Sequence, residues 1–99
     1  MARAMTLEVC VDDVHGLVAA LEGGADRIEL CSALDIGGLT PTPGLLRAAS
    51  SSPVPVVAMI RPRGGDFCYD EAETRLMLDE IDAVAAAGLQ GVEIGRAHV

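Results

Sequence analysis

Residues 7–10 read Leu-Glu-Val-Cys, and residues 28–31 repeat this pattern as Ile-Glu-Leu-Cys. Successive side chains of a β-strand point to opposite faces of the sheet, so each stretch places its glutamate and cysteine on one face and its two apolar residues on the other. Strands of an open parallel sheet, which helices cover on both faces, normally read as continuous apolar runs. A buried face with carboxylates fits a barrel interior better, because several strands can supply counter-charges there. The repeat therefore predicts a parallel β/α barrel.

The rest of the chain alternates predicted strands with predicted helices. The strands are predicted over 6–11, 27–31, 54–60 and from about 91, and the helices over 14–22, 43–52 and 70–87. Asp12-Asp13 and Thr42-Pro43 provide helix start signals, since Asp and Thr cap helices and Pro is favoured in the first turn. Strands separated by helices at this spacing form a parallel sheet with right-handed crossovers. The chain thus holds about three to four β/α units.

The composition and charge are those of one globular unit. The 99 residues include 51% hydrophobic and 22% charged types, and the formal net charge is −8. A strongly acidic protein repels phosphate backbones and anionic lipid surfaces. No stretch is long and apolar enough for a membrane span or a signal peptide. We therefore expect no nucleic-acid partner, no membrane partner and a cytoplasmic location.

Three cysteines are candidate metal ligands. Cys10 and Cys31 end the first two predicted strands, and Cys68 lies in the loop after the third. Three widely spaced cysteines argue against a disulfide framework and for reduced thiols. Binding groups of β/α barrels lie at the carboxyl ends of the strands, and thiolates at equal heights on neighbouring strands, about 5 Å apart, could share a soft ion such as Cu(I) or Zn(II). The alternative is that the cysteines are small buried hydrophobic residues.

Two arginines are candidate anion ligands. Arg61 and Arg63 lie next to the Gly64-Gly65 pair, and guanidinium groups beside flexible backbone amides suit a carboxylate or phosphate of a substrate. The equally supported alternative is that Arg61 neutralises Glu8 and Glu29 inside the barrel, because buried charges must be paired.

Three carboxylates are candidate catalytic groups. Asp66 could act as a general acid or base, although an aspartate in a glycine-rich loop is more often a turn-former. Glu8 and Glu29, which share the predicted inner face, could serve as acid/base partners.

Three stretches resemble the CutC family in their order and spacing. They are Leu7-Glu8-Val9-Cys10, then residues 24–31 with Gly37-Gly38-Leu39-Thr40-Pro41, and Ile60-Arg61-Pro62-Arg63-Gly64-Gly65-Asp66-Phe67-Cys68-Tyr69. The resemblance implies a TIM-type (β/α)8 barrel, here truncated, that is cytoplasmic and often a homo-oligomer. It also implies copper homeostasis and copper ion binding, with Cys10, Cys31 and Cys68 as the Cu(I) ligands. Some members have a second cysteine directly after the first, where this chain has Val11.

The resemblance implies no established reaction, so the sequence leaves the question of an enzyme open. The alternative to copper binding is an uncharacterised TIM-barrel enzyme that acts on a small anionic metabolite held by Arg61 and Arg63.

The last seven residues, 93–99, interrupt the resemblance. They read Glu-Ile-Gly-Arg-Ala-His-Val, which is the translation of the start of a widely used short-read sequencing adapter. We therefore predict that residues 1–92 are the N-terminal part of a CutC-like barrel and that residues 93–99 are not native sequence. About four strands of eight leave two open sheet edges, so we expect the isolated piece to aggregate or remain molten. Sequencing the re-amplified locus through codon 92 tests this prediction.

Overall fold

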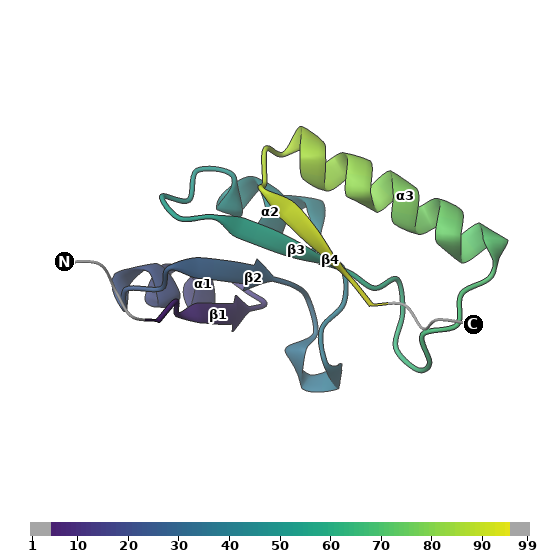
Figure 1. Cartoon of the computed structure of the whole chain (residues 1–99), viewed down its shortest axis with the longest axis horizontal. Coiled ribbons are helices and arrows are strands. Elements are labelled where there is room, and N and C mark those ends of the chain that lie inside the picture. The colour runs from purple at the N-terminus through teal and green to yellow at the C-terminus, as the bar shows by residue number, and fades with distance from the viewer. Residues whose placement is uncertain (1–4, 96–99) are drawn as a thin grey trace.

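Within residues 5–95, four strands form one parallel sheet (Figure 1). The computed structural model describes residues 5–95, so the last four residues of the predicted adapter-derived tail lie outside the described part. The strands follow the sheet in chain order and are β1 (Glu8–Val11), β2 (Arg27–Leu30), β3 (Val56–Ile60) and β4 (Gly91–Ile94). Between them lie α1 (Val14–Glu22), the short 3-10 helix η1 (Leu34–Ile36), α2 (Pro43–Ala49) and α3 (Glu71–Ala86). The predicted alternation and the parallel pairing are confirmed.

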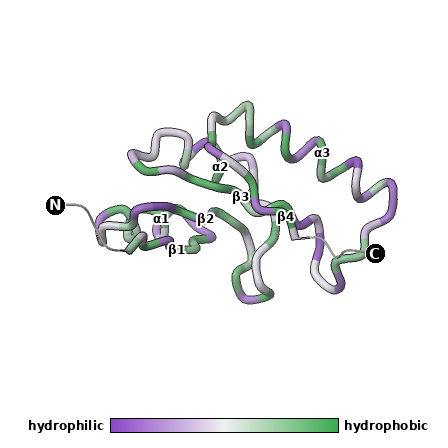
Figure 2. Tube along the Cα trace, viewed as in Figure 1, coloured by the Kyte–Doolittle hydropathy of each residue, from purple (hydrophilic) through white to green (hydrophobic). Residues whose placement is uncertain are grey.

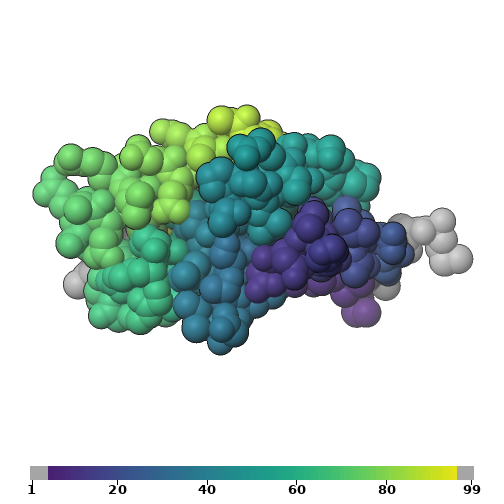
Figure 3. Space-filling model, turned by 180° about the vertical axis from the view of Figure 1, so that it is seen from behind, coloured from purple at the N-terminus to yellow at the C-terminus, as the bar shows by residue number. Residues whose placement is uncertain are grey.

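One face of the sheet carries the hydrophobic core. Apolar side chains that alternate along the strands are buried on this face: Val11, Ile28, Leu30, Val56, Ala58 and Ile60. The helices contribute Leu17 of α1, Leu46 and Ala49 of α2, and Met77 and Val84 of α3 to the same cluster. Seen from behind, the purple α1 region and the teal-blue α2 region lie side by side (Figure 3). Hydrophilic and hydrophobic residues alternate along α3, as expected of a helix with one buried side (Figure 2).

The opposite face of the sheet carries polar side chains, and the helices of residues 5–95 pack on the core face instead. In the strand register Glu8 lies opposite Arg27, Cys10 opposite Glu29, and Met59 opposite Glu93. These positions are half-buried or exposed, whereas their neighbours Val11, Ile28, Leu30, Ala58 and Ile60 are buried in the core. The predicted division of the strands into a polar and an apolar face is therefore confirmed.

Local signals in the sequence position the helices. Asp13 caps α1 by accepting a hydrogen bond from the Gly16 amide at 2.6 Å, and Thr42 caps α2 by accepting one from the Leu45 amide at 3.3 Å. Asp70 begins α3 with a reciprocal capping box, in which Glu73 accepts a bond from the Asp70 amide. Such caps satisfy amides that have no partner inside the helix.

The loop between β2 and α2 folds back onto the end of β3. Ser32 and Leu39 form an isolated antiparallel bridge, and Gly37 and Gly38 both have φ near 96°. The Thr40 amide donates to the Arg61 carbonyl at 3.0 Å, and the Arg61 amide donates to Thr40 Oγ1 at 2.9 Å. These contacts hold the loop against the carboxyl end of β3, where the predicted site residues lie.

Candidate functional site

The two strand cysteines share the polar face but lie at different heights. Cys10 is opposite Glu29 in the register, and its thiol donates a hydrogen bond to Glu29 Oε2 at 3.4 Å. Cys31 lies two residues beyond Glu29, is 1% exposed, and its thiol donates to the Val11 carbonyl at 3.5 Å. The premise that the two cysteines stand at equal heights on their strands was therefore wrong, because the parallel register pairs Cys10 with a carboxylate.

Both strand thiols are held in their protonated form. The pKa of Cys10 is raised from 9.0 to about 11, first by partial desolvation and then by the hydrogen bond and negative charge of Glu29. The pKa of Cys31 is likewise raised to about 11, first by burial and then by the nearby Cys10 and Glu29. Because the thiolate is the reactive and metal-binding form, either thiol must lose a proton before it reacts or binds a metal.

We expect Cys10 to react slowly with iodoacetamide at neutral pH. A pKa two units above 9.0 makes the thiolate about 100-fold rarer than that of an ordinary thiol at pH 7, and its fraction rises about tenfold per pH unit up to pH 11. The measurement is the alkylation rate by mass spectrometry in the full-length protein with Cys31→Ser and Cys68→Ser. Glu29→Gln removes one cause of the raised pKa and should speed the reaction. A rate that levels off below pH 9 would contradict the raised pKa.

Cys68 lies in an exposed part of the loop after β3. Its amide donates to Asp66 Oδ1 at 3.2 Å, and its carbonyl accepts from Arg63 Nη2 at 2.8 Å. Within residues 5–95, no recorded contact joins Cys68 to Cys10 or Cys31. Its part in a shared metal site therefore stays a prediction.

Arg63 organises this same loop. Its guanidinium pairs with Glu73 and with Asp66, donates to the carbonyls of Gly64, Asp66 and Cys68, and lies 5.1 Å from the centre of the Tyr69 ring. Asp66 accepts bonds from Arg63 and from the Cys68 amide, which is the geometry of a turn-forming aspartate. Arg63 and Asp66 therefore both bind groups of the protein itself in this structure.

The other two candidate catalytic groups lie on the polar face. Glu8 forms an ion pair with Arg27, its neighbour in the register. Glu29 has a raised pKa, caused first by desolvation and then by the neighbouring carboxylates, above all Glu93. Single oxygen atoms of Glu8, Glu29 and Glu93 lie within 4.8 Å of one another. The sequence did not predict this carboxylate group, because Glu93 belongs to the segment predicted to be adapter-derived.

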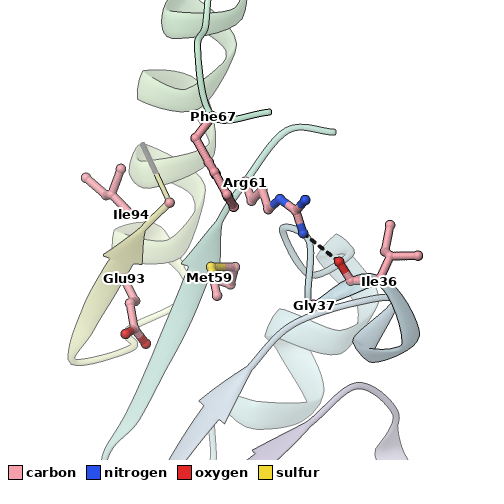
Figure 4. Close-up of a pocket in the computed structure, with 8 residues that line it drawn as sticks. Ile36, Gly37, Met59, Arg61, Phe67, Glu93 and Ile94 are labelled. Atoms are coloured by element: carbon pink, nitrogen blue, oxygen red, sulfur yellow. Dashed lines mark hydrogen bonds between the residues drawn. The ribbon is translucent and has the colours of Figure 1, made fainter. Parts of the chain in front are cut away.

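Arg61 contacts neither Glu8 nor Glu29, so the alternative that it neutralises them was wrong. The residue is 7% exposed and its side chain turns toward the loop after β2 (Figure 4). Nη1 donates to the Ile36 carbonyl at 2.8 Å and to the Gly38 carbonyl at 3.2 Å, and Nη2 donates to the Gly65 carbonyl at 3.2 Å. The Nε atom is buried and has no hydrogen-bond partner among residues 5–95.

Arg61 lines a pocket of about 350 Å³ at the carboxyl end of β3. The other lining residues are Ile36, Gly37, Met59, Phe67, Glu93, Ile94 and Gly95. The Phe67 ring covers the guanidinium, with 4.8 Å between the Arg61 Cζ atom and the ring centre. The sequence identified Arg61 but missed these apolar neighbours, since they come from two connecting segments (Ile36 and Phe67) and two strands (Met59 and Ile94) that only the tertiary fold brings together.

Comparisons with known proteins identify the family. Residues 5–99 match the model of the CutC family. The chain is 66% identical over 89 residues to a family protein CutC of Sinorhizobium medicae, and 60% identical over 94 residues to one of Caulobacter vibrioides. These alignments cover 90% and 95% of this chain but 36% and 38% of the relatives. The chain therefore spans little more than a third of their length.

A solved structure shares the fold. The crystal structure of a CutC protein from Streptococcus agalactiae, whose name assigns it to copper homeostasis, matches with a TM-score of 0.80 and 31% identity. The match covers 89% of this chain and 44% of that one, so the four-stranded sheet corresponds to part of a larger TIM-type barrel. Among residues 5–95, no helix could cross a membrane. The family model, the relatives and the shared fold together show that this chain belongs to the CutC family.

Proposed function

We propose that the full-length protein acts in copper homeostasis in the cytoplasm and binds Cu(I) through Cys10 and Cys31, with Cys68 as a third ligand. The observation that carries this proposal is the position of two thiols on the same face of adjacent strands, at the edge where β/α barrels bind their ligands. The name of the Streptococcus agalactiae relative adds support. Thiolates are soft ligands and favour Cu(I) over hard cations.

The surroundings of the thiols determine how they would take up the ion. Both have raised pKa values, so each must release a proton when it binds the ion. Glu29 already accepts the hydrogen bond of the Cys10 thiol and is placed to take that proton. Cu(I) affinity should consequently strengthen as the pH rises.

We expect Cys10→Ser together with Cys31→Ser to weaken Cu(I) binding of the full-length protein by about 100-fold or more, because a hydroxyl is a poor ligand for a soft ion. The measurement is an anaerobic competition titration against a chromogenic Cu(I) chelator, with circular dichroism to check the fold. Cys68→Ser, in the exposed loop, is the matched control and should cost less than the double substitution. Unchanged affinity in the double variant would refute the ligand assignment.

A further inference from the structure

The guanidinium of Arg61 differs from those of the other arginines in the site region. Arg27, Arg63 and Arg75 each pair with a carboxylate and are at least partly exposed. Arg61 is buried, and within residues 5–95 its recorded polar partners are three backbone carbonyls. Arginine stays charged at all ordinary pH values, so this buried charge lacks a counter-charge in the described part of the chain.

Arg61 has N–H donors that its partners within residues 5–95 leave unused. Arginine has five N–H donors. Nη1 donates to the carbonyls of Ile36 and Gly38, and Nη2 donates to the carbonyl of Gly65. The Nε–H and one N–H of Nη2 remain. Nε and Nη2 form the side edge of the planar group, which binds the two oxygens of a carboxylate with parallel hydrogen bonds. Leaving a buried donor unpaired is destabilising, and a bound carboxylate would remove that cost.

The walls next to this edge are apolar. Ile36, Met59 and Phe67 line the pocket, and Ile36 and Phe67 are 51% and 42% exposed. The Phe67 ring covers the guanidinium and belongs to the loop after β3, so a ligand would have to displace this partly exposed ring to reach Nε. In Figure 4 the Glu93 side chain points away from the Arg61 guanidinium. Glu93, Ile94 and Gly95 also line the pocket but lie in the segment predicted to be adapter-derived, so we assign the contacts of a ligand to Arg61, Ile36, Met59 and Phe67 alone.

Glycine at position 37 keeps the space beside the guanidinium open. Its φ of 96° is one that other residues rarely adopt, and a Cβ atom there would lie 3.3 Å from Arg61 Nη1. The carbonyls that hold the guanidinium thus come from a backbone that requires glycine.

We propose that this pocket binds a small organic carboxylate, whose carboxylate pairs with the Nε–Nη2 edge of Arg61 and whose apolar body lies against Ile36, Met59 and Phe67. This site is separate from the cysteines, so it stands or falls independently of copper binding. Inorganic phosphate has the charge but no apolar body, and should bind more weakly than an organic acid of similar size.

The test uses the full-length, copper-free protein and saturation-transfer NMR titrations with butyrate, with 1-butanol as the neutral analogue and inorganic phosphate as the anion without an apolar body. Butyrate should bind more tightly than either. Arg61→Gln should weaken butyrate binding by about 10- to 100-fold, because it removes a charge-assisted bidentate contact. Arg27→Gln, which removes an arginine already paired with Glu8, is the matched control and should leave binding unchanged.

A second measurement does not depend on whether the Arg61 variant folds. The Nε–H resonance of Arg61 in the wild-type protein should shift on titration with butyrate and stay in place with 1-butanol. Failure of butyrate to bind, or equal binding of butyrate and phosphate, would overturn the proposal. A protein carboxylate found on Arg61 Nε in a crystal structure of the full-length protein would overturn it too. Loss of Cu(I) binding in the cysteine variants has no bearing on either outcome.

Discussion

Replacing Leu30 with alanine is expected to destabilise the full-length protein by about 2–5 kcal/mol, because the substitution leaves a cavity that a packed core fills only in part. Leu30 is fully buried at the centre of the sheet, with Val11 and Ala58 as its register partners on either side. Both register partners are buried as well, so the neighbouring strands have little freedom to move into the space that the leucine side chain leaves. The measurement is the free energy of unfolding from urea titration followed by circular dichroism.

The matched control for this prediction is Leu78→Ala on α3. Leu78 is 58% exposed, so the same loss of side-chain atoms should change the free energy of unfolding by no more than about 0.5 kcal/mol. Similar losses in the two variants would mean that the apolar face of the sheet is not the core of the protein.

Replacing Gly37 with alanine should destabilise the protein by about 1–3 kcal/mol, since it forces a non-glycine residue to a strongly positive φ and brings its Cβ against Arg61. The loop that carries Gly37 supplies two carbonyls to the Arg61 guanidinium, so the same substitution should also weaken butyrate binding. Thermal unfolding and the NMR titration measure the two effects.

Gly44→Ala is the opposite case on the neighbouring helix. Gly44 lies in α2, and a Cβ atom there would meet nothing within 4 Å. Because alanine favours a helix by up to about 1 kcal/mol over glycine, this variant should be more stable than the wild type. Two glycine-to-alanine changes in one protein should therefore have opposite signs, and equal signs would mean that the loop around Gly37 has a different backbone conformation.

Local sequence patterns were enough to predict the order of strands and helices and the two faces of the sheet. Alternation within 7–10 and 28–31 separated Glu8 and Cys10 from the core, since neighbouring strand residues must point to opposite faces. Helix starts followed from Asp13 and Thr42, because capping depends on residues only three positions away. These features are local, so the chain specifies them without reference to its tertiary contacts.

The contacts between side chains of the site could not be predicted in this way, because they depend on how the strands and loops pack together. The strand register places Cys10 beside Glu29 rather than beside Cys31. The sequence could not predict this, because the alternation of polar and apolar residues within each strand is the same whichever residues of the two strands are paired. The Arg61 guanidinium donates hydrogen bonds to backbone carbonyls and not to the carboxylates that one interpretation of the sequence predicted. The reason is that the bridge between Ser32 and Leu39 holds the loop with Gly37 against the end of β3. Partners of a long side chain depend on loop conformations and strand offsets, which are set by packing across the whole molecule and not by neighbours along the chain.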